Sequence, residues 1–312
     1  MRKRVGKVNK FILLFYALLA IFFFFILTIT VKEKAGKYLP LKKAAVLLAD
    51  SAFKIVKAYR LNNGIPIDIL NDPSETGLIG VPYSLITYEE VNLDLVKASL
   101  PANYAALFVE LLKERRLKAN DSLIVYFDGS FPALNISLLS AIKILKIKPI
   151  IFLSVASVAY GANLPNFTFL EILDTLNKAK IFDFYVDYAL IGGYDEMGSG
   201  LSLAAREFIK EKVSFYRIKL ITKEEKAAFF SKFKNKAFLE IAYNKINPKR
   251  WQAEYEIKEE LFKGRLFYEK RYSLFLTVCF LAILLIFLYL IIKYDLEYYL
   301  FGKREEIYKE GI

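Results

Sequence analysis

The sequence predicts an α/β fold: a doubly wound, mainly parallel sheet between an N-terminal and a C-terminal transmembrane helix. Two observations carry this prediction. Two stretches without a charged residue stand near the ends of the chain, at residues 11–30 and 272–292. Between them, short apolar runs without polar alternation are separated by helical segments. Such runs are typical of parallel strands that are covered on both faces.

The two uncharged stretches predict membrane spans. A helix that crosses a hydrocarbon core needs about 20 apolar residues, and both stretches reach that length. Tyrosines crowd the end of the second stretch, as in an aromatic belt at a membrane interface. The alternatives are a buried core helix or, for the first stretch, a cleaved signal peptide. Uniform hydrophobicity and the length of the apolar run favour two spans.

Around these spans the sequence divides into a short tail, a domain and a second tail. The basic N-terminal tail covers residues 1–10, the domain covers 31–271 with its core at about 75–222, and the C-terminal tail covers 293–312. The dense basic cluster before the first span favours cytoplasmic termini. We therefore predict a two-pass protein of the cell membrane with an extracytoplasmic domain.

The first elements of the domain are helical and irregular. Residues 40–60 place apolar side chains on one face at helical spacing, which predicts an amphipathic helix. Residues 62–82 are dense in Gly, Pro, Asn and Asp and predict a loop. Residues 101–116 begin with a proline, which suits the start of a helix.

The following alternation of strands and helices sets the fold class. It predicts a three-layer, Rossmann-like sheet with right-handed crossovers. The pattern weakens after residue 214, where an edge strand at 215–221 precedes Lys-rich helical sequence through residue 243 and a linker to the second span. The alternating strands are residues 123–127, 149–155 and 188–193, and the helices are residues 132–146, 165–179 and 201–213.

The charge and the composition restrict the function. The chain carries 45 Lys and Arg against 33 Asp and Glu; nine and five of these lie outside residues 31–271, which leaves the domain with +8. A basic domain beside a membrane predicts anionic lipid head groups or an anionic polymer as neighbours, or simply a solubilising surface. Nothing in the sequence predicts a nucleic-acid partner.

The chain has no histidine, and its one cysteine, Cys279, lies inside the second span. Ser-His-Asp hydrolysis, Cys-His catalysis, His or Cys metal sites and structural disulfides are therefore excluded within a single chain. The cofactor stays unknown. A divalent cation held by oxygen ligands is the one metal chemistry that the composition leaves open.

Polar loops follow the predicted strands, at the edge where parallel sheets bind ligands. After the first strand, Asp128, Gly129 and Ser130 form a turn into the next helix. This turn suits a helix cap, an anion site or an exposed nucleophile. After the second strand, Ser157, Tyr160 and Asn163 are the candidates for ligand contact.

A glycine-rich loop follows the third strand. It suits a phosphate or carboxylate cradle, with Asp195 and Glu196 as ligands for a divalent cation, or a flexible turn before a helix. A fourth loop, at residues 72–80, precedes the alternation and is interpreted as a lid over the crevice or as a connecting loop. The ligand candidates in these two loops are Glu75, Thr76, Gly77, Gly192, Gly193, Gly198 and Gly200.

At these four loops the sequence resembles the poly-gamma-glutamate system proteins, which are membrane-anchored products encoded beside poly-gamma-glutamate synthase components. The resemblance implies a role in making or exporting that anionic polymer, with the synthase components as partners, and it implies no settled reaction. The residues that carry it are Glu75–Gly80, Gly129–Asn135, Tyr160–Asn163 with Pro165, Phe167 and Thr168, and Gly192, Gly193, Asp195, Gly198 and Gly200–Ser202.

Three hypotheses follow. The first is an accessory subunit that binds the polymer or the synthase partners through the α/β domain. The second is a membrane-bound hydrolase or transferase that acts on the polymer or a phosphorylated precursor, with Ser130, Asp128 and Asp195 as catalytic candidates. The third, a structural scaffold, does not account for glycine-rich loops placed at strand ends. The first ranks ahead because no complete catalytic constellation can be assembled.

Overall fold

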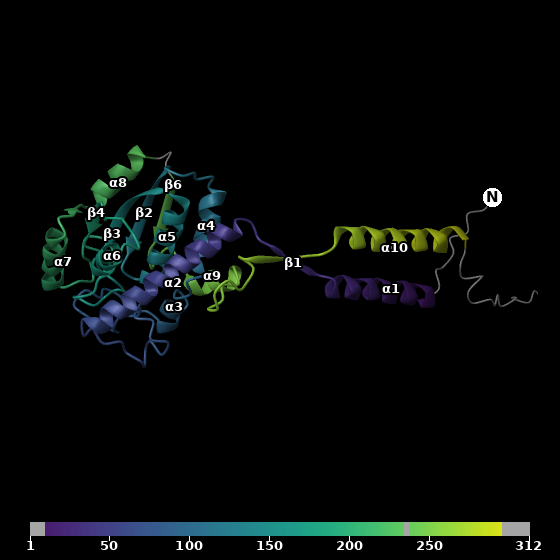
Figure 1. Ribbon diagram of the computed structural model, residues 1–312, viewed down its shortest axis with the longest axis horizontal. Helices are drawn as coiled ribbons and strands as arrows, with labels where there is room; N and C mark the ends of the chain where they lie inside the picture. Colours follow the sequence, from purple (N-terminus) through teal and green to yellow (C-terminus); the bar gives the residue numbers. More distant parts are fainter. Residues whose placement is uncertain (1–9, 234–236, 295–312) are drawn as a thin grey trace, which may run out of the picture. The chain divides into compact units, whose positions relative to one another are not determined.

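The computed structural model describes residues 10–233 and 237–294 (Figure 1). It divides the chain into two compact units, one formed by Ala35–Tyr268 and the other by the parts of the chain before and after it. Apart from Lys10, Lys293 and Tyr294, the predicted tails lie outside the described residues. The unit of Ala35–Tyr268 lies within residues 31–271, which the sequence analysis treats as the domain.

A five-stranded sheet forms the centre of this unit, and its strand order is β5-β4-β3-β2-β6. All four strand pairs are parallel. The sheet extends from β2 in both directions, with β3, β4 and β5 on one side and β6 on the other. The predicted α/β fold with a parallel sheet is therefore confirmed. The strands are β2 (Ser122–Asp128), β3 (Lys148–Ser154), β4 (Tyr188–Leu190), β5 (Lys219–Leu220) and β6 (Ala237–Ile241).

Right-handed crossovers determine which face of the sheet each helix covers. The chain moves from β2 to β5 in one direction, so α5, α6 and α7 belong to one face. The helices α2 and α4 join this layer by packing against α5 (Figure 1). The return crossing from β5 to β6 places α8 on the opposite face. These helices are α2 (Leu39–Asn62), α4 (Tyr104–Glu114), α5 (Pro132–Leu145), α6 (Phe169–Lys178), α7 (Leu203–Phe215) and α8 (Lys223–Lys232).

The two faces of the sheet have cores of different size. Alternate residues of β2 point to opposite faces, so Val125 and Phe127 belong to the large core under α2, α4 and α5. Ile124 and Tyr126 belong to a small aromatic core under α8. In that core Phe152 contacts the rings of two α8 phenylalanines at 5.1 Å between ring centroids. The face under α8 is therefore the thinly covered one.

The structure corrects one prediction. The sequence after residue 221 was predicted to stay helical through residue 243, but Ala237–Ile241 forms the edge strand β6 beside β2. Leu239 and Ile241 are buried, Glu240 between them is half-buried and Phe238 before them is exposed, which is the alternation of a strand with one protected face. Because β6 has only five residues and follows Lys-rich helical sequence, its apolar pattern could not be distinguished from a continuation of the helix. Two further helices, α3 (Leu93–Lys97) and α9 (Pro248–Glu254), were not predicted.

The second unit contains the two apolar helices. Their aromatic side chains pack together, with the rings of Phe23 and Phe280 stacked at 4.4 Å between centroids. Among the described residues one segment, Leu274–Ile291, is long and apolar enough to cross a membrane, while the apolar part of the first helix, Leu13–Ile29, is shorter. The elements of this unit are α1 (Lys10–Ile29), α10 (Leu274–Tyr294) and most of the paired strands β1 (Lys32–Ala35) and β7 (Tyr268–Arg271).

Candidate functional site

The strand order places a topological switch point at β2. The chain continues from β2 to β3 on one side, and β6 returns to the other side of β2. In open parallel sheets the ligand crevice lies at the carboxyl ends of the strands that flank such a point. Asp128 ends β2, and Tyr243 follows β6 by two residues, so these two residues mark the switch point.

Asp128 connects the two strand ends through backbone hydrogen bonds. One carboxylate oxygen accepts the amide of Ser130 and the other accepts the amide of Tyr243, each at 2.9 Å. The side chain is only 5% exposed. Burial raises the pKa of Asp128 to about 6, although both amides favour the charged form. The sequence predicted Asp128 and Ser130 as neighbours, and the structure places them in contact.

The hydroxyl of Ser130 connects Asp128 to a tyrosine that the sequence did not single out. It lies within hydrogen-bonding reach of the Asp128 carboxylate and of the Tyr88 hydroxyl. Burial raises the pKa of Tyr88, and the nearby charge of Asp128 adds to the effect. Ser130 is 0% exposed, so its hydroxyl can reach a substrate only after neighbouring parts of the chain move.

A second cluster of polar side chains lies under α8, at the same edge of the sheet as Asp128. Lys226 of α8 forms an ion pair with Glu196, and its amine lies 4.0 Å from the centre of the Tyr126 ring. Burial raises the pKa of the Tyr126 hydroxyl, and the neighbouring side chain of Ser154 opposes this shift. Burial also raises the pKa of Glu240, which is opposite Tyr126 in the register of β2 and β6. This group joins carboxylates, a lysine and a buried tyrosine.

The glycine-rich loop does not bring its two carboxylates together. Asp195 is exposed, and one of its oxygens accepts the amides of Met197 and Ser199 at 2.9 Å, hydrogen bonds that lower its pKa. The next residue, Glu196, turns to Lys226 instead. Within residues 10–233 and 237–294, no three Asp, Glu or Cys side chains are grouped so that they could hold a metal ion.

The glycines of this loop are needed for close packing. Gly192 has a φ of +100°, and a Cβ there would lie 2.6 Å from the Cβ of Ala156. A Cβ on Gly198 would meet the side chain of Arg206 at 2.9 Å. Gly193 and Gly200 also have positive φ angles, at 89° and 87°. The loop can therefore lie directly against the end of β3 and the start of α7.

The loop after β3 holds a segment of the chain across the strand ends. Residues 80–89, which we call the strap, bond to this loop at several points. Tyr160 donates to Val81, and Ser157 exchanges backbone hydrogen bonds with Ile86 and Tyr88. The side chain of Asn163 accepts from the amide of Val81 at 2.9 Å and donates to its carbonyl at 2.7 Å. Three residues that were predicted to contact a ligand therefore hold the strap in place through hydrogen bonds.

The first loop belongs to the same packed assembly. The backbone of Gly129 accepts the amide of Ala162 at 2.7 Å, and the side chain of Asn135 donates to the backbone of Asp128 at 2.9 Å. A Cβ added to Gly161 would lie 2.7 Å from the Gly129 carbonyl. The loops after β2 and β3 therefore fit together at glycine positions.

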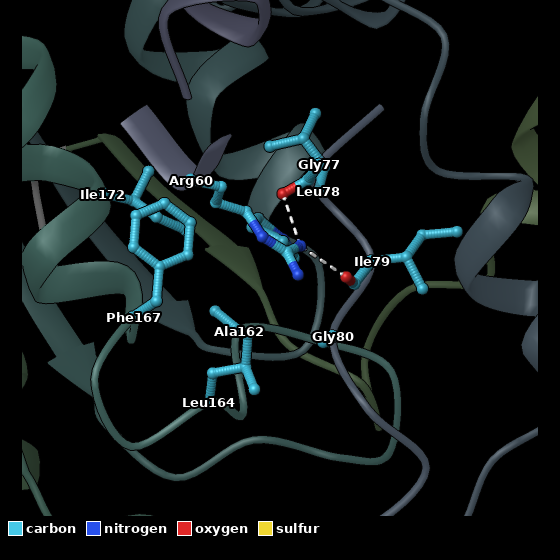
Figure 2. A pocket seen from close by; sticks show the side chains of 11 residues that line it. Arg60, Gly77, Leu78, Ile79, Gly80, Ala162, Leu164, Phe167 and Ile172 are labelled. Atoms are coloured by element: carbon cyan, nitrogen blue, oxygen red, sulfur yellow. Dashed lines mark hydrogen bonds between the residues drawn. The ribbon is translucent and has the colours of Figure 1, made fainter. Parts of the chain in front are cut away.

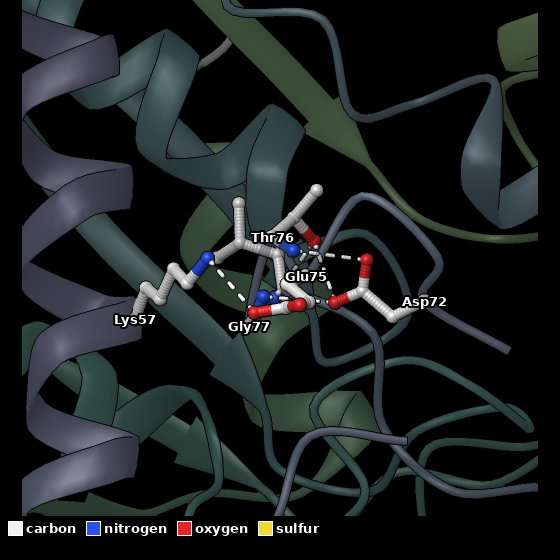
Figure 3. A network of polar contacts seen from close by, with 6 residues as sticks. Lys57, Asp72, Glu75, Thr76 and Gly77 are labelled. Carbon is white, nitrogen blue, oxygen red and sulfur yellow. Dashed lines mark hydrogen bonds and ion pairs between the residues drawn. The ribbon is translucent and has the colours of Figure 1, made fainter. Parts of the chain in front are cut away.

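The predicted fourth loop is organised by a buried aspartate (Figure 3). Asp72 is 1% exposed and accepts the amides of Thr76 and Gly77 at 2.9 and 2.8 Å. It also accepts the Thr76 hydroxyl at 3.0 Å. Glu75 is exposed and pairs with Lys57 of α2 at 3.4 Å. Thr76 and Gly77 are therefore engaged within their own segment, and Glu75 is directed toward α2.

A small pocket lies beside this loop, and a buried arginine points into it (Figure 2). Arg60 of α2 is 2% exposed and donates to the carbonyls of Gly77, Ile79 and Pro66. Burial lowers the pKa of its guanidinium group, while the charge of Asp72 opposes the shift. The pocket has space of about 10 Å³, room for one water-sized group.

Most of the pocket lining consists of residues from the loops that the sequence singled out as ligand candidates. Residues 77–80 form one wall, and Pro132, Gly161, Ala162 and Phe167 contribute to the others. The sequence indicated these residues but not Arg60, because an arginine in an amphipathic helix is ordinarily solvated. Comparison with family models, with curated proteins and with solved structures finds no match to this chain.

Proposed function

We propose that this chain is a membrane-anchored accessory component of poly-gamma-glutamate biosynthesis and export. Its α/β domain binds the anionic polymer or the synthase partners. The observation that carries the proposal is the packing of the resemblance motifs into one assembly at the carboxyl edge of the sheet. Loops from distant parts of the chain meet there, and residues 77–80, Pro132 and residues 161–167 contribute to a pocket that a buried cationic side chain, Arg60, also lines.

The anchoring part of the proposal rests on the two apolar helices. Leu274–Ile291 has the length and composition of a membrane span, and α1 packs against α10 through aromatic side chains. A pair of packed apolar helices, joined to the two ends of the domain, supports the proposal of a two-pass protein of the cell membrane. We propose an extracytoplasmic domain, since the basic residues before the first span favour cytoplasmic termini.

A deletion strain tests the function directly. We expect loss of polymer, or a change in its length, when the chain is deleted from a polymer-producing host, and recovery when it is supplied again. The tagged chain should co-purify with synthase components from detergent-solubilised membranes. Unchanged polymer yield and length in the deletion strain would contradict the proposal. Protease digestion of the domain in intact cells and in inverted vesicles tests the orientation.

A specific observation favours a second candidate function, a hydrolase or transferase that acts on the polymer or on a phosphorylated precursor. Asp128 has a pKa raised to about 6 by burial, and the Ser130 hydroxyl lies beside it. A carboxylate with such a pKa can accept a proton from a hydroxyl nucleophile near neutral pH. Both groups are buried and Tyr88 of the strap lies beside them, so this function requires a movement that exposes them.

Three single variants test the second candidate. Ser130→Ala removes the hydroxyl, Asp128→Asn removes the base, and Asp195→Ala removes the third candidate carboxylate. An enzyme predicts that the first two abolish polymer processing, while the accessory role predicts that folded variants keep it. The folded state of each purified variant is checked by its thermal unfolding before activity is compared.

A further inference from the structure

Arg60 does not use all of its hydrogen-bonding capacity within the protein. A guanidinium group has five N–H donors. Three of them bind the carbonyls of Gly77, Ile79 and Pro66. The Nε atom is buried and has no hydrogen-bond partner in the described part of the chain. A buried donor without an acceptor costs about 1 to 3 kcal/mol, which an acceptor from a ligand would recover.

Arg60 lines a small pocket, and the pocket brings its guanidinium group close to a place that one atom of a ligand can enter. Apolar side chains of Leu164, Phe167 and Ile172 line it together with the backbone of residues 77–80 (Figure 2). Phe167 also lies against the guanidinium group, with its ring centroid 5.9 Å from the central carbon of Arg60. The apolar lining keeps the local dielectric low, so an anion that reaches Arg60 is bound more strongly than in water.

We infer that the Arg60 pocket is a subsite for one oxygen of a carboxylate group, with Arg60 as the cation that binds it. This inference rests on the proposed function, which supplies the carboxylate: each unit of a glutamate polymer linked through its side chain carries one free carboxylate. The space of about 10 Å³ admits one oxygen and is too small for a whole phosphate or sulfate group. Arginine is the side chain best suited to carboxylates.

The pocket fits a carboxylate better than a permanently bound water. A buried water ordinarily makes about three hydrogen bonds to polar groups. Here Arg60 already occupies the carbonyls of Gly77 and Ile79, and much of the remaining lining is apolar. A carboxylate oxygen needs only the donors of Arg60, and the rest of the ligand stays outside.

The test uses the full-length protein in detergent, with γ-linked glutamate oligomers as the probe and calorimetry as the measurement. Ala162→Val fills the pocket and leaves Arg60 in place, and Arg60→Lys keeps the charge without the planar donors. Two control variants are matched to these. Lys57→Gln removes a cation three residues earlier in α2, and Ala204→Val makes the same change on the exposed surface of α7.

We expect both pocket variants to weaken oligomer binding by about tenfold or more and both controls to bind like the unmodified protein. An oligomer whose carboxylates are converted to amides should not bind. Free glutamate serves as a further arm, since its binding at the same strength would assign the site to a small carboxylate. Unchanged oligomer binding by Ala162→Val, with unchanged thermal unfolding, would overturn the inference.

The outcome is distinguishable from failure of the proposed function. If deletion of the chain abolishes polymer but Ala162→Val binds oligomers normally, the function stands and the pocket inference is wrong. If the pocket variants lose binding but deletion leaves the polymer unchanged, the pocket is a carboxylate site and the proposed function is wrong.

Discussion

Arg60 and Asp128 are both buried charges beside the loop that contains Gly161, yet their surroundings differ. Each is at most 5% exposed, and each organises a loop through backbone hydrogen bonds. Both oxygens of Asp128 are occupied by backbone amides. Arg60 binds three carbonyls and keeps its Nε free, next to a pocket.

The difference separates two uses of a buried charge. Asp128 holds the ends of β2 and β6 together, and its remaining contact is with Ser130, a residue of the same turn. Arg60 holds residues 66–79 on α2, keeps its buried Nε without a partner among the described residues, and lines a pocket. We therefore assign a structural role to both residues and a ligand-binding role chiefly to Arg60.

The largest expected effect is the loss of Arg60. Arg60→Met keeps an apolar stem of similar length but leaves the carbonyls of Gly77, Ile79 and Pro66 without a donor and Asp72 without its nearby cation. We expect the free energy of unfolding to fall by about 3 to 5 kcal/mol. Chemical denaturation of the full-length protein, followed by Trp251 fluorescence, measures it.

The matched control is Lys57→Met on the same helix. Lys57 pairs with the exposed Glu75 at 3.4 Å, and exposed pairs of this kind contribute about 0 to 1 kcal/mol. If the two variants lose equal stability, the assignment of Arg60 as the organiser of the loop is wrong.

The next effect is the pH dependence that Asp128 brings. Its pKa is about 6 in the folded protein against a usual 3.8, so the folded state binds the proton more tightly than the unfolded state. Its contribution to stability is therefore fully present below pH 3.8 and is lost as the pH rises through 6. The loss amounts to roughly 3 kcal/mol at 1.4 kcal/mol per pKa unit.

Asp128→Asn isolates this contribution, because the amide has the same shape and does not titrate. We expect the stability of the unmodified protein, relative to this variant, to decline between pH 4 and pH 7 and to stay level above that range. Denaturation curves at several pH values give the difference. A difference that is constant with pH would show that burial does not shift the pKa of Asp128.

Much of the fold could be predicted from the sequence because its signals are local. The apolar runs at β2 and β3 and the helices between them have a periodicity that burial on both faces requires. The strand β6 was missed because its five residues pair with β2, which lies more than 100 residues earlier. Pairing over such a distance leaves no local pattern in the sequence.

The candidate site was predicted in part for a similar reason. Asp128 and Ser130 are two residues apart in one turn, so their contact follows from the local sequence. Tyr88 and Lys226 reach the same edge of the sheet from the strap and from α8, and nothing in their local sequence indicates this. Arg60 was missed because the loop that buries it is irregular, and its path is set by Asp72.

A smaller effect is expected to distinguish two buried serines, Ser130 and Ser137. Ser130→Ala removes a hydroxyl that stabilises charged Asp128, so the pKa of Asp128 should rise further and stability should fall by about 1 kcal/mol. Ser137 in α5 is equally buried, but its hydroxyl has no hydrogen-bond partner among the described residues. Ser137→Ala should therefore leave stability unchanged or raise it slightly. Equal losses in the two variants would mean that Ser130 does not interact with Asp128.

The smallest effect is expected at Asp195, the exposed counterpart of Asp128. Both carboxylates accept backbone amides, but Asp195 is solvated, so its hydrogen bonds lower its pKa instead of being outweighed by burial. Its contribution is therefore present at neutral pH and lost as the pH falls below about 4, the opposite sign to Asp128. Asp195→Asn should cost about 0.5 kcal/mol at pH 7, measured by the same denaturation curves. If the stability difference between the unmodified protein and Asp195→Asn instead increased as the pH fell, as it should for Asp128→Asn, burial would not be what separates the two aspartates.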